Sequence, residues 1–256
     1  MANDSQDIIV LADRMLTSYD NTLCFELDGS KIEKLFENSV ALTAGAATLH
    51  QSIYQGCQAE IREKSPLISD VAAKIKEKYQ EIRNMYLSDQ VFTRRGLTLE
   101  SFYKMQHSLH EGTIADLNNY MDQYVLPLQM LVAGVDELAH IYMIGDPGIL
   151  IPLDSLGFAC IGTGTRHAEV TFAYRKYSKK LDTPKALYIA FEAKKRAEMA
   201  GGVGQTTDIM IASKGCGFRI VKDNIISQLE EIYKSVEEQS GYGKDVDEAI
   251  GKIQLD

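Results

Sequence analysis

The stretch DIIVLADR, at residues 7–14, governs which fold can be expected, because a short β-branched apolar run ends there in an acid and a base. The run at residues 7–12 follows a polar, turn-forming segment and predicts a buried strand. Further strands are expected at residues 31–36, where polarity alternates, and at residues 39–43, which are apolar up to a break at Gly45. The sequence therefore opens with a group of strands.

Helical periodicity then replaces the alternating pattern. A first helix is expected at residues 46–64, and Ser65 followed by Pro66 predicts the cap and first turn of a second helix. A third helical stretch is expected from Thr98, with a bend at Gly112. The apolar stripe of the second helix comprises Ile68, Val71, Ala72, Ile75, Tyr79, Ile82 and Tyr86. Such stripes indicate core packing, and no cofactor site follows from them.

Strands are expected again at residues 128–135, 139–144 and 156–161, with a turn at Asp146-Pro147-Gly148. Two helices follow, and Thr183-Pro184 marks the beginning of the second.

A hairpin is then expected between residues 208–212 and 218–221, and a last amphipathic helix from Ile225 precedes a polar tail from Glu237 that is expected to be loose. Runs of strands separated by pairs of helices indicate an α+β protein with two sheets stacked between helical layers. A doubly wound parallel sheet would alternate strand and helix singly.

Composition limits the classes of function. The 256 residues include 27 Lys and Arg against 36 Asp and Glu, so 27 − 36 gives a net charge of −9. This balance disfavours a protein that binds nucleic acid through a wholly basic surface. The cysteines Cys24, Cys57, Cys160 and Cys216 lack metal-ligand spacing. No apolar run has the roughly 18 residues of a membrane helix, and we expect a cytoplasmic protein without cofactor or metal.

Three short motifs resemble binding sites but lack the necessary context. Residues 201–207 resemble a phosphate-binding loop, yet a helix is expected before it and a strand after it, the reverse of what phosphate binding needs. Gly162-Thr163-Gly164 lacks the third glycine of a dinucleotide site. His107 and His110 are three residues apart on an expected helix, but no third metal ligand accompanies them. The basic runs at 179–180 and 194–196 are interpreted as solvated faces.

A set of motifs in a fixed order resembles the proteasome-type N-terminal-nucleophile hydrolases, which include proteasome β subunits and smaller bacterial ATP-dependent peptidases. The matching motifs are Ile9-Val10-Leu11-Ala12-Asp13-Arg14, Lys31-Ile32-Glu33-Lys34-Leu35, Leu42-Thr43-Ala44-Gly45, Val132-Ala133-Gly134-Val135-Asp136, His140-Ile141-Tyr142, Asp146-Pro147-Gly148 and Ile161-Gly162-Thr163-Gly164. The resemblance implies a four-layer αββα sandwich in one domain at residues 1–222. An enlarged helical insertion is expected at about residues 84–118, and residues 223–256 form a C-terminal helix and tail.

The resemblance also implies a threonine-type peptidase site. In this family the first residue supplies a nucleophilic hydroxyl and its own α-amine takes the proton. By motif, Asp13 is the carboxylate that holds the lysine Lys31, the N–H of Gly45 donates to the oxyanion, and Thr163 replaces a serine. Glu198 is the nearest candidate for the second acid of the site, although the glycine-rich stretch after it differs in length from the family pattern.

The nucleophile is missing from this pattern, since Met1 and Ala2 offer neither hydroxyl nor thiol and a first strand has no room before Asp7. One hypothesis is an upstream start that restores a peptidase. A second is a non-catalytic ring-forming or scaffold subunit, and a third is a binding protein on the same fold. The partners that the resemblance implies are a peptide or protein substrate, a homo-oligomeric ring and an ATP-dependent unfoldase, with no nucleic acid and no membrane.

Overall fold

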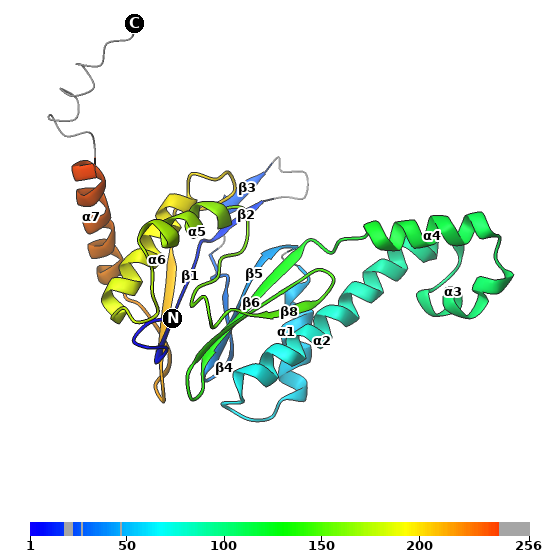
Figure 1. The fold of residues 1–256 in the computed structure, drawn as a ribbon, viewed down its shortest axis with the longest axis horizontal. Helices are drawn as coiled ribbons and strands as arrows, with labels where there is room; N and C mark the ends of the chain where they lie inside the picture. The colour runs from blue at the N-terminus through cyan, green and yellow to red at the C-terminus, as the bar shows by residue number, and fades with distance from the viewer. Residues whose placement is uncertain (18–22, 27, 47, 241–256) are drawn as a thin grey trace, which may run out of the picture.

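A computed structural model describes residues 1–17, 23–26, 28–46 and 48–240 of the chain. The expected α+β class is confirmed, because antiparallel sheets and helices alternate in groups along the chain (Figure 1). The strands at Asp7–Ala12 and Leu128–Val135 have the bounds that the sequence predicts.

The larger sheet has five antiparallel strands in the order β4-β5-β6-β7-β8. Their bounds are β4 (Ile32–Phe36), β5 (Ser39–Gly45), β6 (Leu128–Val135), β7 (Ala139–Gly145) and β8 (Ile149–Pro152). Ala133 at the centre of the sheet pairs with Val40 on one side and with Ile141 on the other. The strands lie in the sheet in their order along the chain, although a run of helices separates β5 from β6 in the sequence.

The second sheet has three strands in the order β1-β9-β10. Their bounds are β1 (Asp7–Ala12), β9 (Asp208–Ser213) and β10 (Gly217–Ile220), so the first strand of the chain pairs with one near its end. The hairpin expected between β9 and β10 is confirmed. A short separate pair, β2 (Met15–Thr17) and β3 (Cys24–Glu26), lies beyond the end of β1.

The two sheets face each other, and helices cover their outer faces (Figure 1). Side chains of β1, β5 and β6, such as Ile8, Val40 and Leu131, form a core between the sheets. Helices α1 (His50–Glu60) and α2 (Ile68–Leu87) pack on the other face of the larger sheet, where Ile53 and Ile75 are fully buried. Burial of these apolar faces stabilises both layers.

Three helices, α5, α6 and α7, cover the smaller sheet. Helix α6 (Thr183–Ala197) lies against β1 and α5 (Thr165–Tyr174), while α7 (Asp223–Ser240) packs beside α6. Asp182 caps α6 by accepting a hydrogen bond from the N–H of Lys185 at 3.0 Å. Helix α7 continues beyond Glu237, where a loose tail was expected, and residues 241–256 lie outside the described part of the chain.

A helical arm extends away from the sheets (Figure 1). It comprises the end of α2, η1 (Ser88–Phe92), η2 (Thr93–Arg95), α3 (Leu99–Met105), η3 (Gln106–Ser108) and α4 (Glu111–Gln123), and it includes the expected insertion at residues 84–118. The arm has its own small core, formed by Leu87, Phe92, Phe102 and Leu117. Arg83 donates to Asp146 at 2.8 Å and to the carbonyl of Tyr124 at 3.1 Å, which ties the base of the arm to the turn between β7 and β8.

One strand prediction, at residues 156–161, was wrong, and one strand before it was missed. Residues 156–161 lack regular strand structure, and the fifth strand of the sheet is β8 instead. The run LGFACI is apolar because Phe158 and Cys160 pack against α5 and α6, and not because it pairs with a neighbour. An apolar run alone does not distinguish a packed loop from a strand.

The helix starts also differ from prediction. Helix α1 is shorter than residues 46–64, and α2 begins at Ile68 rather than at Ser65 and Pro66. The carboxylate of Asp136, on the turn after β6, accepts a hydrogen bond from the N–H of Ile68 at 3.0 Å. Asp136, which is distant in sequence, therefore caps the start of α2 in place of a local N-cap residue.

The third helical stretch is broken rather than bent near Gly112. Thr98, where the stretch was expected to start, caps α3 with a reciprocal capping box through Ser101. His107 lies in η3, whereas the side chain of His110 caps α4 by accepting from the N–H of Gly112. The two histidines are thus not on one helix face.

Candidate functional site

The carboxyl end of β1 carries a paired acid and base. The ammonium of Lys31 donates to Oδ1 of Asp13 at 2.7 Å, and the side chains are 20% and 19% exposed. The same carboxylate oxygen accepts a hydrogen bond from the N–H of Met15 at 2.6 Å. This local bond fixes the carboxylate directly after the strand, and the charge pair joins two segments 18 residues apart.

Arg14 provides a second fixed point at the same place. Its guanidinium contacts Asp208 at the start of β9, with Nη2 to Oδ1 at 2.6 Å and Nε to both carboxylate oxygens at 3.0 and 3.1 Å. Burial raises the pKa of Asp208. The hydrogen bonds from Arg14 and Ser30, together with the positive charges of Arg14 and Lys194, outweigh burial and leave this pKa below its usual value. The pair locks the end of β1 to β9 and so keeps Asp13 in place.

Gly45 is at the end of β5 and has a left-handed backbone with φ +98°. A Cβ atom there would collide with the backbone carbonyl of Pro127. Both the backbone conformation and this close contact therefore require glycine. The N–H of Ala46 donates to that same carbonyl at 2.7 Å. The backbone thus passes very close to its neighbour strand at the point where the resemblance implies an oxyanion donor.

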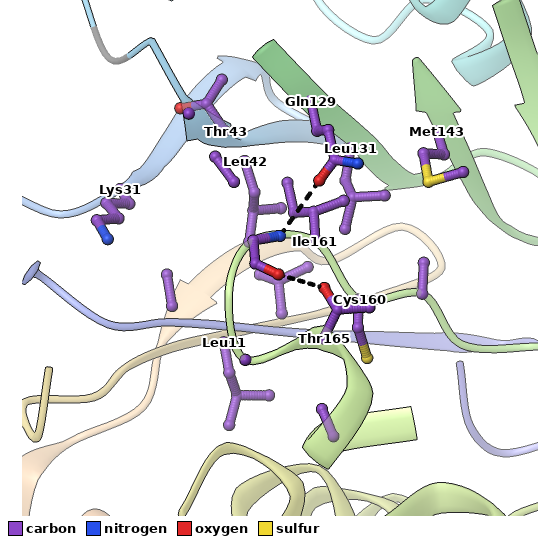
Figure 2. A pocket seen from close by; sticks show the side chains of 18 of the residues that line it. Leu11, Lys31, Leu42, Thr43, Gln129, Leu131, Met143, Cys160, Ile161 and Thr165 are labelled. Atoms are coloured by element: carbon purple, nitrogen blue, oxygen red, sulfur yellow. Dashed lines mark hydrogen bonds between the residues drawn. The ribbon is translucent and has the colours of Figure 1, made fainter. Parts of the chain in front are cut away.

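Thr163 is exposed in the loop that leads into α5. Two bonds shape this loop: the N–H of Gly162 donates to Oε1 of Gln129 at 3.3 Å, and the hydroxyl of Thr165 donates to the carbonyl of Gly162 at 2.8 Å (Figure 2). Gly162 has φ +92°, which favours glycine at this turn. The loop is therefore held to β6 on one side and to α5 on the other.

Asp13, Lys31, Gly45 and Thr163 all line one cavity. Its volume is about 1440 Å³, and it lies between the two sheets and extends to the loop at residues 157–165 (Figure 2). Its walls are mostly apolar, with contributions from Val10, Leu42, Leu131, Ile141, Met143 and Ile161. The paired charges of Asp13 and Lys31 border this mostly apolar cavity at the end of β1, and an apolar cavity with a few oriented polar groups is the form expected of a binding site.

One edge of β1 opens on this cavity. Ala2 and Asp7 exchange two backbone hydrogen bonds of 2.9 and 3.2 Å, so the main-chain groups of Asp7 point away from β9. Because main-chain direction alternates along an antiparallel strand, Ile8 and Val10 bond to β9 while Ile9 and Leu11 point to the opposite edge. The cavity is lined by both of the latter residues.

A buried lysine near the site was missed by the sequence analysis. Lys194 is only 8% exposed and donates to Oε1 of Glu198 at 2.5 Å. The basic run at residues 194–196 is therefore not a uniformly solvated face. Its apolar neighbour Ala193 and the fully buried Glu192 show that this turn of α6 faces the core, a signal that the charge pattern concealed.

Glu198 contacts lysines other than Lys31. Its second oxygen accepts from Lys195 at 2.8 Å, and Lys195 also contacts Glu230 of α7 at 3.3 Å. Glu198 is not among the residues that line the cavity. As the second acid of the site it receives no support from this geometry.

No protein-family model matches the sequence, and no curated protein matches it. Among the described residues, no three or more His, Cys, Asp or Glu side chains are grouped to hold a metal ion. Over the same residues, no helix combines the length and apolar character required to span a membrane.

Proposed function

We propose that this chain is a proteasome-like subunit of the threonine-type, N-terminal-nucleophile peptidase family, and that it cleaves peptide bonds when a nucleophile-bearing strand lies beside β1. The observation that carries the proposal is the 2.7 Å pair between Lys31 and Asp13, at the end of an open strand edge and in one cavity with Gly45. An ion pair on an ordinary solvent-exposed surface is not placed beside an open strand edge and an apolar cavity, as this pair is.

The layer order supports the proposal. Helices α1 and α2, the larger sheet, the smaller sheet and then α5 and α6 follow one another, as in the αββα sandwich of the family. Fold alone does not determine function, so the polar groups carry the greater weight.

The open edge offers a course for the nucleophile strand. The Ala2–Asp7 bridge is antiparallel, and a chain that continued it would run along Ile9 and Leu11 towards Asp13. From Asp7 to Asp13 a strand advances about 20 Å, or roughly six residues. The first residue of such a strand would then be beside Lys31.

The chemistry would proceed in two steps at that point. The hydroxyl of the first residue attacks the peptide carbonyl, its proton passes to the α-amine, and the oxyanion accepts a hydrogen bond from the N–H of Gly45. Collapse breaks the C–N bond, the α-ammonium returns its proton to the leaving amine, and an ester remains. The freed α-amine then takes a proton from water, which attacks the ester, and that proton passes to the hydroxyl oxygen as the acid product leaves. The positive charge of Lys31, held by Asp13, keeps the α-amine unprotonated and ready to act as base.

A matched pair of lysine variants tests this proposal. Lys31→Ala in the full gene product should abolish hydrolysis of a fluorogenic peptide, because the ammonium beside the nucleophile is lost. Lys34→Ala, at an exposed position of β4, the strand that follows Lys31, should leave hydrolysis unchanged. Equal activity of the Lys31 variant and the unmodified protein would reject the assignment.

A non-catalytic ring-forming or scaffold subunit is the second candidate, and the helical arm favours it. Tyr103 and Met105 of α3 and Tyr120 of α4 are large apolar side chains that are exposed on the arm. Such residues are typical of surfaces that pack against another subunit. A homo-oligomeric ring with an ATP-dependent unfoldase is compatible with either candidate. Native mass spectrometry that detects only monomers would argue against the ring.

A further inference from the structure

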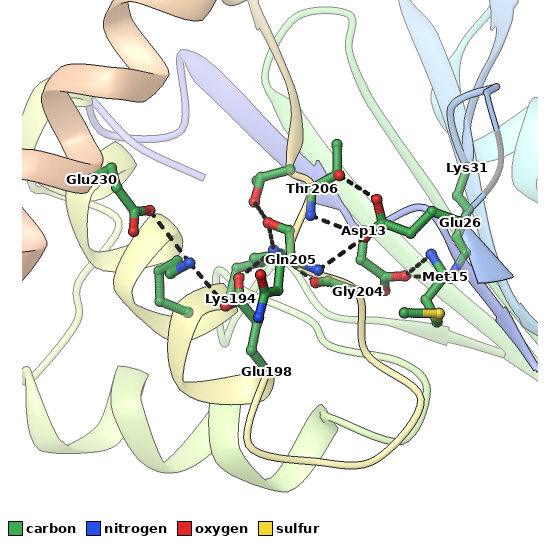
Figure 3. Close-up of polar contacts among 12 residues, drawn as sticks. Asp13, Met15, Glu26, Lys31, Lys194, Glu198, Gly204, Gln205, Thr206 and Glu230 are labelled. Atoms are coloured by element: carbon green, nitrogen blue, oxygen red, sulfur yellow. Dashed lines mark hydrogen bonds and ion pairs between the residues drawn. The ribbon is translucent and has the colours of Figure 1, made fainter. Parts of the chain in front are cut away.

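The glycine-rich loop before β9 is held by opposite charges on its two sides (Figure 3). On one side, the ammonium of Lys194 donates to the carbonyls of Gly204 at 3.0 Å and Gln205 at 2.8 Å. On the other, the carboxylate of Glu26 accepts from the N–H groups of Gln205 at 3.1 Å and Thr206 at 3.2 Å. The positive charge therefore contacts carbonyl oxygens, and the negative charge contacts N–H groups, which is the favourable orientation of the peptide dipoles.

The contacts of Lys194 account for a cationic group at a buried position. Burial lowers the pKa of Lys194, while its contact with Glu198 acts in the opposite direction. Two carbonyls and one carboxylate occupy the three donors of the ammonium. A buried ammonium with this full set of partners holds the loop more firmly than an exposed lysine could.

The loop in turn supports the paired site. A Cβ atom at Gly204 would come within 2.6 Å of Oε1 of Glu26 and 3.1 Å of Cβ of Met15, so the loop packs directly on Met15. The N–H of Met15 is the group that donates to Asp13, and Asp13 holds Lys31. A continuous path of contacts thus leads from Lys194 to Lys31.

We propose that Lys194 and Glu26 are positioning residues that clamp the loop at residues 204–206 against Met15 and thereby fix the Asp13–Lys31 pair. As a role in catalysis, this inference rests on the proposed function. As a statement about the geometry of the pair, it stands apart from it.

Hydrogen exchange at the Met15 amide tests the clamp without any need for activity. In the full chain, Lys194→Met and Glu26→Ala should each raise the exchange rate of this amide about tenfold, the equivalent of one lost hydrogen bond. Lys195→Met is the matched control, since Lys195 contacts Glu198 but neither loop carbonyl. Its Met15 amide should exchange at the unmodified rate. Glu26→Gln keeps an acceptor oxygen and should restore most of the protection.

A glycine pair keeps the test decisive if Lys194→Met unfolds the protein. Gly204→Ala pushes on Met15 and Glu26 and should accelerate exchange at Met15, whereas Gly201→Ala in the same loop meets nothing within 4 Å and should not. Unchanged exchange in Glu26→Ala and Gly204→Ala, or an equal rise in Lys195→Met, would overturn the clamp.

The catalytic part of the inference has a separate readout. In a preparation that hydrolyses peptides, Lys194→Met should lower kcat with KM unchanged, because substrate contacts persist while the Lys31 ammonium is displaced. A loss confined to KM would overturn this role. If the unmodified protein fails to hydrolyse peptides, the proposed function fails, and the exchange experiment still decides the clamp.

Discussion

The two faces of the five-stranded sheet differ in how completely they are filled. On the helix side, Val71, Ala72, Ile75 and Tyr79 of α2 are fully buried against the sheet. On the side of the smaller sheet, the same strands border a cavity of about 1440 Å³. Close packing is the rule in protein interiors, so a hollow of this size beside a polar site indicates a place for another group.

This difference separates stability from function within one sheet. The packed face buries apolar side chains of α1 and α2 against the sheet, whereas the hollow face borders the open edge of β1, in the smaller sheet, and the Asp13–Lys31 pair. Substitutions should accordingly lower the free energy of unfolding strongly on the packed face and only weakly on the hollow face.

The largest effect is expected for Ile75→Ala on the packed face. Removal of this fully buried side chain should reduce the free energy of unfolding by about 3–4 kcal/mol, because the transfer of its methylenes is lost and a new void forms. Urea denaturation followed by circular dichroism measures the change. A loss below about 1 kcal/mol would show that this face is not closely packed.

A smaller contrast is expected when alanines on the two faces are enlarged. Ala72→Ile should cost about 1–3 kcal/mol through overpacking against α1 and the sheet. Ala133 lines the cavity, and Ala133→Ile should change stability by less than about 1 kcal/mol because the added methyl groups enter open space. Equal costs in the same denaturation experiment would contradict the comparison.

Leu131→Ala should have a modest effect. Leu131 is buried in the core between the sheets, but part of it borders the cavity, so fewer contacts are lost than at Ile75. The expected loss is about 1–2 kcal/mol, at the low end for a leucine truncation. A loss as large as that of Ile75→Ala would indicate that the hollow face is closed in solution.

Thiol reactivity should differ between the faces with no change in stability. Burial raises the pKa of Cys160, on the cavity side, to about 12 and that of Cys57, on the buried face of α1, to about 11. The thiolate is the reactive form, so in both cases reaction should be slow at pH 8 and accelerate about tenfold per pH unit below the pKa. In a Cys24→Ser, Cys216→Ser background, iodoacetamide should modify Cys160 in the native state through the cavity.

Cys57 provides the control for that experiment. Because it lies in the packed face, its modification should require unfolding and should increase with urea well before the rate at Cys160 does. Peptide mapping by mass spectrometry separates the two sites. Native-state modification of Cys57 at the rate of Cys160 would remove the distinction.

The sequence was informative where structure depends on neighbouring residues. The apolar runs that form β1 and β6 and the start of a helix near Thr98 were predicted correctly, because local pattern determines them. Strand β8 was missed, since a four-residue run that ends in proline gives a weak signal. The start of α2 depends on Asp136, which is 68 residues from Ile68, and no local rule could find it.

The same division holds at the site. Asp13 and Lys31 were selected from motifs, and their contact was expected only through the resemblance to a family. The burial of Lys194 depends on carbonyls 10 and 11 residues further along the chain and on how the loop folds back over α6. A charge run in a sequence cannot reveal which of its members turns inward.

Residue-resolved hydrogen exchange along β1 tests most directly whether this strand keeps one edge open to the cavity. In the chain of 256 residues, we predict that the amides of Ile9 and Leu11 exchange at least about tenfold faster than those of Ile8 and Val10, which bond to β9. Equal protection of all four amides would mean that both edges are already paired, and it would contradict the site proposed here.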